Sequence, residues 1–130
     1  MSRLDIKICG LSTIEAIDAA VRGGASHVGF MHFAKSPRHE TPQRLAMLAT
    51  RVPAHVQRVS ILVDADDTTI DALIAAGGLH VLQLHGAEPP ERVAALRART
   101  GLEAWKVLSI KTAADLANSA AYPGPADRLL

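Results

Sequence analysis

The sequence predicts an α/β fold with parallel strands, and three observations lead to this prediction. Short apolar segments alternate with helical patterns along the chain, and successive strand starts lie about 23 to 29 residues apart. Hydrophobic residues make up 48% of the 130 residues and aromatic residues only 3%, which favours aliphatic packing of helices on a sheet. Glycine, proline and capping residues separate the segments. A regular alternation of this kind implies βαβ units with right-handed crossovers.

Strands are expected at six places. They cover residues 4–9, 27–31, 56–63, 81–84, 104–108 and 127–130, where the sixth strand only begins. In the first strand, alternation places Lys7 and Cys9 on one face, and Ile6 and Ile8 on the other.

A helix is expected between each pair of strands. The helices span about residues 13–22, 42–51, 69–76, 87–99 and 112–118. Ser12 and Glu15 have the spacing of a capping box at the first helix, and Thr41 is an N-cap followed by a proline at the second. Glycines follow the first, third and fourth helices and provide stop signals.

Two architectures fit this alternation, an open doubly wound sheet and a (β/α)8 TIM barrel. Lys7 and Gln83, near strand ends on the inward face, suit a barrel interior, and no strand is followed by a GxGxxG or Walker-type loop. A barrel of this kind needs about 200 residues at least. We therefore expect residues 1–130 to be the N-terminal part of a single barrel domain, with five-and-a-half βα units.

Composition narrows the classes of partner. The net charge is +1 with both signs interspersed, and no basic block of the kind used on nucleic acid or membranes occurs. The single cysteine excludes an internal disulfide and CxxC-type metal sites. Residues 1–5 show no signal-peptide pattern, and no apolar run approaches the roughly 20 residues of a membrane span. We expect a cytoplasmic protein with a small-molecule partner, and neither nucleic acid nor membrane.

Cys9 ends the first strand, where parallel α/β folds bind their ligands. A cysteine works as a base or nucleophile only as a thiolate. The alternative is a small buried residue, and position alone leaves both interpretations equally open. Lys7, on the same face, could act on Cys9 electrostatically, but pairing with an inward carboxylate is the favoured expectation.

Arg38 and His85 follow the second and fourth strands. A guanidinium binds a carboxylate in a bidentate fashion, whereas a solvated loop arginine is the commoner case for such a position. Ser36 and Pro37 would stiffen the loop that carries Arg38. His85 could contact a ligand or orient a neighbour, or could be a histidine satisfied at the barrel mouth.

No metal site is expected. The other histidines lack ligand spacing and are interpreted as solvated or structural; they are His27, His32, His39, His55 and His80. Asp64, Asp66 and Asp67 are interpreted as an acidic helix start. Trp105 is expected to pack in the core.

Four strand-end motifs, in order, resemble those of the phosphoribosylanthranilate isomerase family, a (β/α)8-barrel family of tryptophan biosynthesis. They are Lys7-Ile8-Cys9-Gly10; Gly29-Phe30 with Phe33 and Lys35-Ser36-Pro37-Arg38; Val63 with its acidic turn; and Gln83-Leu84-His85-Gly86 with Glu88-Pro89. Each motif is weak alone. Their order and spacing extend the resemblance over essentially the whole chain.

The resemblance implies an Amadori rearrangement of N-(5-phosphoribosyl)anthranilate to 1-(2-carboxyphenylamino)-1-deoxyribulose 5-phosphate, without cofactor or metal. It implies that Cys9 is the general base, that Arg38 faces the anthranilate carboxylate and that His85 lines the pocket. Lys7 is counted with the substrate-binding residues.

The family's general acid after strand six, and its phosphate-binding loops after strands seven and eight, are not among these 130 residues. We therefore expect the stretch alone to be inactive. The expected partner is a phosphorylated small molecule, and the expected state is a monomer or homodimer.

Two rival interpretations remain. Indole-glycerol phosphate synthase, another phosphate-binding barrel, uses lysine and glutamate at its strand ends, so Cys9 argues against it. The other rival is a non-catalytic truncated barrel that associates with itself through open strand edges.

Overall fold

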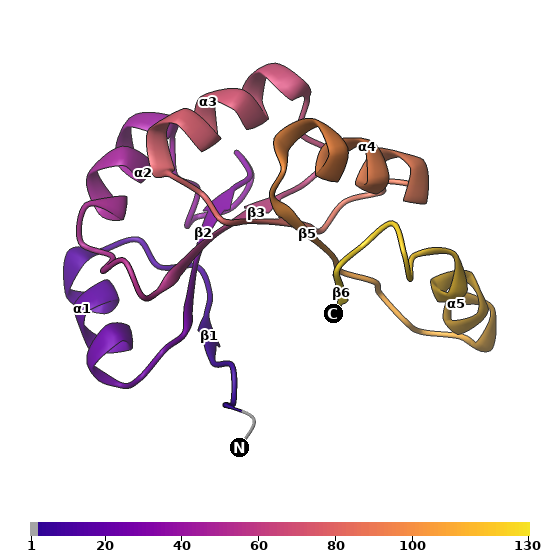
Figure 1. The fold of residues 1–130 in the computed structure, drawn as a ribbon, viewed down its shortest axis with the longest axis horizontal. Coiled ribbons are helices and arrows are strands. Elements are labelled where there is room, and N and C mark those ends of the chain that lie inside the picture. The colour runs from indigo at the N-terminus through magenta and orange to yellow at the C-terminus, as the bar shows by residue number, and fades with distance from the viewer. Residues whose placement is uncertain (1–2) are drawn as a thin grey trace.

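The computed structural model describes residues 3–130 and shows a curled parallel sheet with helices on its convex side (Figure 1). Residues 1 and 2, part of the segment in which no signal peptide was expected, lie outside the described residues. The elements are β1 (Lys7–Ile8), α1 (Ile14–Arg22), β2 (His27–His32), α2 (Pro42–Ala49), β3 (Gln57–Leu62), α3 (Asp67–Gly77), β4 (Val81–Leu84), α4 (Pro90–Thr100), β5 (Glu103–Lys106), α5 (Ala113–Asn118), the 3-10 turn η1 (Ser119–Ala121) and β6 (Arg128–Leu129).

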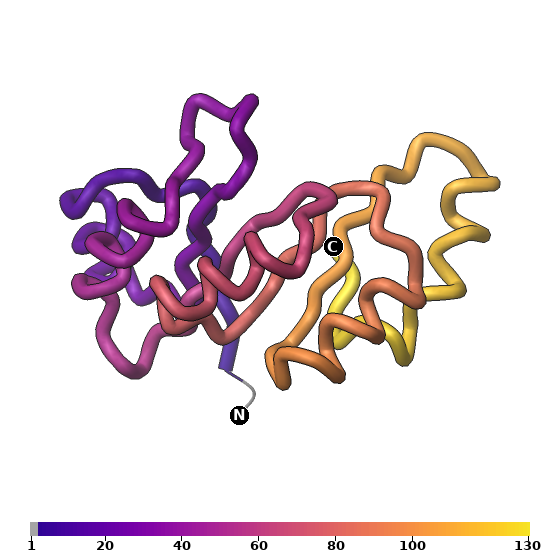
Figure 2. Tube along the Cα trace, turned by 90° about the horizontal axis from the view of Figure 1, so that it is seen from above, coloured from indigo at the N-terminus to yellow at the C-terminus, as the bar shows by residue number. Residues whose placement is uncertain are grey.

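The strand order decides between the two predicted architectures. The six strands are hydrogen-bonded in sequence order from β1 to β6, and every pair is parallel. A doubly wound sheet would reverse direction at a switch point, and this order has no reversal. The result is a half-barrel, in which both ends of the described chain lie on the concave side (Figure 1). In the view from above, the loop between β2 and α2 projects beyond the strands (Figure 2).

Apolar side chains pack on both faces of the sheet. The larger cluster fills the layer between the sheet and the outer helices, and Phe30, Leu48, Leu62 and Leu84 are among its buried members. A smaller cluster of Val59, Val81 and Trp105 lies on the other face. The prediction that Trp105 packs in the core is therefore confirmed, and the guanidinium of Arg128 lies 4.8 Å from its ring centroid.

The helix starts confirm one predicted cap and correct another. Thr41 caps α2 by accepting a hydrogen bond from Arg44 N, as predicted. At α1 the predicted capping box is wrong, because Thr13 is the N-cap and its side chain accepts from Ala16 N. Thr13 has the extended backbone that an N-cap needs, so the helix begins one residue later than Ser12 would place it.

Strand ends also differ from the prediction. β1 is limited to Lys7–Ile8 instead of residues 4–9, and β5 is Glu103–Lys106 instead of 104–108. β1 has β2 as its one neighbour among the described residues, so few ladder hydrogen bonds define it. β3 and β4 have partners on both sides and match their predicted positions within one residue.

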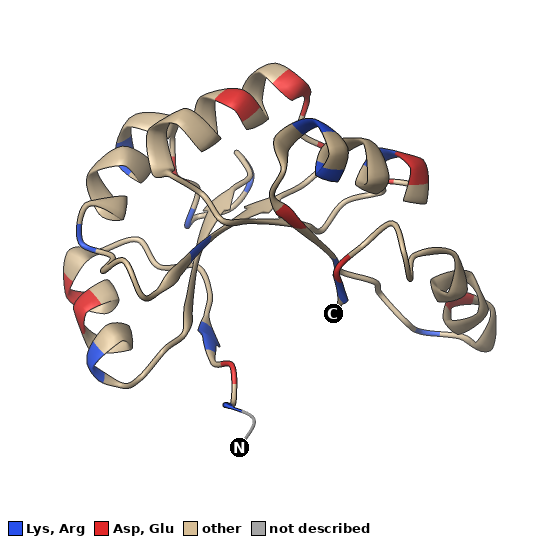
Figure 3. Ribbon diagram, in the orientation of Figure 1, with Lys and Arg blue, Asp and Glu red and all other residues tan. Residues whose placement is uncertain are grey.

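The two outer strands of the half-barrel leave apolar side chains exposed. The large exposed apolar residues within or next to β1 and β6 are Leu4, Ile6, Ile8, Leu129 and Leu130. Arg128 of β6 nevertheless forms an ion pair with Asp5, which precedes β1, at 3.0 Å between Nη1 and Oδ2. Acidic and basic residues occur together along the outer helices (Figure 3). Among residues 3–130, no helix has the length and hydrophobicity needed to cross a bilayer.

Truncation of the core leucine in α2 should test this packing. Leu48 is fully buried, so Leu48→Ala should lower the free energy of unfolding by about 2–5 kcal/mol through lost burial and a residual cavity. Its neighbour Met47 is 44% exposed, and Met47→Ala should cost less than about 1 kcal/mol. Urea unfolding of the two variants measures both values. Equal losses would contradict the assigned face of α2.

Candidate active site

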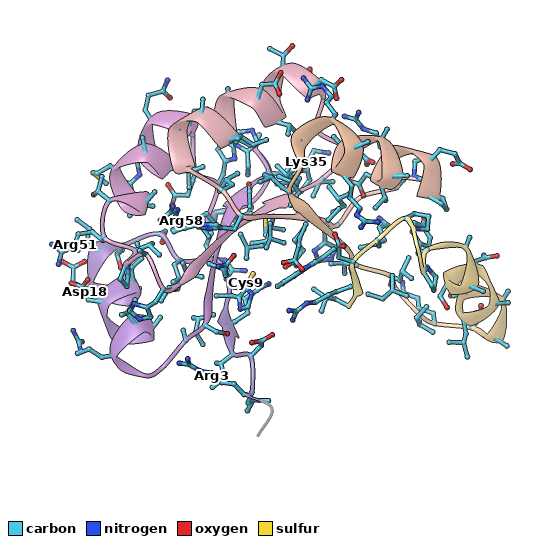
Figure 4. All side chains as sticks on the ribbon, in the orientation of Figure 1. Arg3, Cys9, Asp18, Lys35, Arg51 and Arg58 are labelled. Atoms are coloured by element: carbon cyan, nitrogen blue, oxygen red, sulfur yellow. The ribbon has the colours of Figure 1, made fainter. Side chains whose placement is uncertain are left out.

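Three of the four predicted site residues lie where strands or their loops reach one end of the half-barrel. Cys9 follows β1, Arg38 lies in the loop after β2, and His85 follows β4. Because all strands are parallel, their carboxyl ends meet at this end, which is where ligands bind in barrels. Cys9 lies on the concave side of the sheet (Figure 4).

Cys9 is a free and solvent-exposed cysteine. Its neighbour on β2 is Gly29, where an added Cβ would lie 3.5 Å from the Cys9 sulfur and 2.8 Å from Cδ1 of Ile61. The missing side chain at Gly29 makes room for Ile61, whereas the Cys9 sulfur lies at an ordinary van der Waals distance.

The guanidinium of Arg38 covers the residue that follows Cys9. A Cβ added at Gly10 would lie 2.7 Å from the Arg38 Cζ, and Gly10 has a φ of +69°, which favours glycine. The loop holds this placement, since Arg38 N donates to Ser36 Oγ at 3.1 Å and Ser36 N donates to Phe33 O at 2.8 Å. The structure thus places the guanidinium of Arg38, from the loop after β2, over the residue that follows the free thiol of Cys9.

Lys7 points across the interior of the half-barrel, as alternation predicted. The prediction that it pairs with a carboxylate is wrong. Its Nζ donates to Gln83 Oε1 at 2.5 Å, and Gln83 is buried on β4. β1 and β4 are not adjacent in the sheet, so this bond spans the interior. The partner is an amide rather than a carboxylate, and an amide oxygen leaves the ammonium charge of Lys7 in place.

His85 is exposed at the end of β4. Its backbone N–H donates to Leu62 O at 2.8 Å, which continues the β3–β4 pairing by one residue. The side chain is therefore presented at the rim by a fixed backbone.

A buried ion pair beside His85 was missed by the sequence analysis. Lys106 Nζ lies 2.8 Å from Glu88 Oε1, and the two side chains are only 2% and 4% exposed. Burial raises the pKa of the Glu88 carboxyl, but hydrogen bonds from Lys106 and from the backbone N–H of Asp64 outweigh it and leave that pKa below its usual value. The sequence did contain a signal for this pair. Lys106 lies within a strand that was expected to be buried, and a buried charge needs a partner.

The acidic residues after β3 have structural roles. Asp66 caps α3 by accepting from Thr69 N at 2.8 Å, which confirms the predicted acidic helix start. Asp64 has a φ of +48° and accepts from Ala87 N at 2.8 Å. Asp67 forms an ion pair with Arg92 at 2.6 Å. Across residues 3–130, His, Cys, Asp and Glu side chains form no group of three suited to a metal ion.

Three of the remaining histidines have structural partners. The buried His27 packs against Trp105 with ring centroids 5.2 Å apart, and burial is the main cause that lowers its pKa. His32 Nδ1 lies 2.8 Å from Glu40 O, and Nδ1 of His80 accepts a hydrogen bond from Arg58 N at 3.0 Å.

Comparison with known proteins places this chain in one family. Residues 6–126 match the family described as N-(5'phosphoribosyl)anthranilate (PRA) isomerase. The chain is 50% identical over 127 residues to the N-(5'-phosphoribosyl)anthranilate isomerase of Azorhizobium caulinodans, covering 98% of this chain and 56% of the relative. The chain thus spans about half the length of the curated relatives it matches.

Solved structures agree with this match. The phosphoribosyl anthranilate isomerase of Thermotoga maritima superposes with a TM-score of 0.89 at 26% identity, covering 98% of this chain and 61% of its own. A second isomerase structure, in complex with reduced 1-(o-carboxyphenylamino)-1-deoxyribulose 5-phosphate, superposes with a TM-score of 0.86 at 28% identity. It covers 92% of this chain and 61% of its own.

A pair of glycine substitutions should test the contact between Arg38 and Gly10. Gly10 and Gly101 have φ values of +69° and +71°. Because alanine disfavours this left-handed backbone, alanine at either position should lower the free energy of unfolding by about 1–2 kcal/mol. Only Gly10→Ala should move Arg38, because nothing lies within 4 Å of a Cβ at Gly101. The Nε–Hε resonance of Arg38 in ¹H–¹⁵N NMR spectra reports the movement. An unchanged resonance in Gly10→Ala would contradict the contact.

Proposed function

Because this chain belongs to the N-(5'-phosphoribosyl)anthranilate isomerase family, we propose that it forms part of the enzyme of that name in tryptophan biosynthesis. The reaction would be the Amadori rearrangement of N-(5-phosphoribosyl)anthranilate to 1-(2-carboxyphenylamino)-1-deoxyribulose 5-phosphate. The observation that carries the proposal is that the free thiol of Cys9 lies at the carboxyl end of β1, with the guanidinium of Arg38 over the next residue, Gly10.

In the proposed mechanism Cys9 is the general base. A general acid first donates a proton to the ribose ring oxygen, and the ring opens to a protonated Schiff base. The Cys9 thiolate then takes the proton from C2, and the C–H electron pair forms the double bond of an enolamine. Tautomerisation of the enolamine gives the ketose product. The exposure of Cys9 beside Gly29 supports this role, because a base must reach its proton.

The other predicted site residues would bind the substrate. Arg38 would hold the anthranilate carboxylate, for which a planar guanidinium is well suited. His85 would line the pocket from the end of β4. Lys7 would contribute a positive charge from the interior, where Gln83 holds its ammonium group.

We propose that residues 1–130 are the N-terminal five-and-a-half βα units of one (β/α)8-barrel domain. The sequential order of the strands supports this, as do the exposed apolar residues along the two outer strands. The proposed partner is a phosphorylated small molecule, with neither nucleic acid nor membrane, and the enzyme would be cytoplasmic. A monomer or a homodimer is proposed, and a solved Thermotoga relative is described as dimeric.

A second candidate function, self-association without catalysis, is favoured by the same exposed strand edges. Leu4 is 77% exposed and Leu130 is 52% exposed, and outer strands readily pair with another copy. Sedimentation analysis of the 130-residue chain at several concentrations would detect such assembly.

Replacement of Cys9 should test the proposed base. The assay uses a chimeric enzyme in which this chain is followed by the remaining C-terminal part of the Azorhizobium caulinodans relative. Cys9→Ala should lower kcat by about 10²–10⁴-fold, the usual contribution of a general base, without a matching loss of stability. Lys35→Ala, an exposed lysine in the Arg38 loop, is the control and should retain activity. A loss below about tenfold for Cys9→Ala would argue against a general base.

The 130-residue chain by itself should not turn over the substrate. The residues that the family resemblance assigns as the general acid and the phosphate-binding loops are not among its 130 residues. A fluorescence assay of anthranilate substrate consumption, run beside the chimeric enzyme, measures this. Turnover by purified 1–130 material above the uncatalysed rate would overturn the expectation.

A further inference from the structure

The buried pair Lys106–Glu88 lies outside the proposed substrate pocket. Lys106 is opposite Leu84 in the β4–β5 register, whereas Trp105 is opposite Gln83. Gln83 points into the barrel interior, where it meets Lys7. Because side chains alternate along a strand, Lys106 and Leu84 face the other way, toward the helices. Lys106 is thus directed away from the concave side, where the substrate pocket is proposed.

The pair holds both backbone polar groups of Gly86. Lys106 Nζ donates to Gly86 O at 2.6 Å and makes a longer contact of 3.4 Å with Leu84 O. Glu88 Oε1 accepts from Gly86 N at 2.9 Å. These contacts fix the backbone on both sides of His85, whose own N–H is bound to Leu62 O. Two buried charges thus hold backbone atoms on both sides of His85.

Asp64 and Tyr122 form two further hydrogen bonds with Glu88. The second carboxylate oxygen of Glu88 accepts from Asp64 N at 2.9 Å, which ties the turn to the end of β3. Tyr122 OH donates to Glu88 O at 2.9 Å, and its ring centroid lies 5.9 Å from Lys106 Nζ. An ion pair buried in this way is a poor source of stability compared with an apolar pair, but it fixes geometry through its many directed hydrogen bonds.

We propose that Lys106 and Glu88 are positioning residues that set the place of His85 in the active site by holding Gly86. The inference rests on the proposed function, since it requires His85 to contact the substrate. Displacing a substrate-contacting group by about 1 Å costs roughly 10²-fold in rate. Loss of the pair should therefore reduce catalysis through His85.

The test is a double-mutant cycle in the chimeric enzyme. Lys106→Met leaves Glu88 buried without its partner, so Glu88→Leu is made with it to remove the unpaired charge. This double replacement should lower kcat/KM by roughly 10- to 100-fold. In a His85→Ala background it should cost less than about twofold more, because the pair acts through a side chain already removed. Lys111→Met, an exposed lysine after β5, is the matched control and should leave kcat/KM unchanged.

The outcomes separate this inference from the proposed function. If His85→Ala alone leaves kcat/KM unchanged, the proposed role of His85 fails and the inference fails with it. If His85→Ala is damaging but the double replacement costs the same in both backgrounds, only the inference is overturned.

A structural readout uses the 130-residue chain itself. The ring resonances of His85 in ¹H–¹³C NMR spectra should shift with the double replacement and not with Lys111→Met. Unshifted His85 resonances in a folded double variant would also overturn the inference.

Discussion

The pairing of each strand with the next one along the chain is the constraint on which this structure depends. His32 is paired with Leu62, Leu62 with Leu84, and Leu84 with Lys106, so the carboxyl ends of neighbouring strands coincide. Parallel pairing in sequence order leaves helices on one face and curls the sheet with its natural twist. Loops that are far apart in the sequence are thereby collected at one end of the half-barrel.

Each face of the sheet carries a polar contact made by a lysine. On the concave face Lys7 donates a hydrogen bond to Gln83 across the interior. On the convex face Lys106 pairs with Glu88. Its ammonium group also donates a hydrogen bond to Gly86 O in the turn after β4. The two lysines thus have different partners, an amide on the concave face and a carboxylate on the convex face.

The outlines of the fold were predictable from the sequence, because the signals are local. Hydrophobic periodicity, the cap at Thr41 and the glycines after helices located the strands and helices to within a few residues. The strand-end motifs indicated Cys9, Arg38 and His85 as candidate site residues, and parallel strands implied that they share one end. The errors lie at element boundaries, as at Ser12 and at β1, where hydrogen bonds to neighbouring segments decide the last residue.

By itself, then, the sequence determined the alternation of strands and helices, the family resemblance and the residues at the strand ends. Only the tertiary structure decided which residues meet. Lys7 and Gln83 are 76 positions apart, and the amide partner of Lys7 cannot be read from local pattern. The placement of Arg38 over Gly10 and the burial of Lys106 against Glu88 likewise depend on how separate loops approach. The strand order, which excludes a doubly wound sheet, is also a property of long-range pairing and not of any one segment.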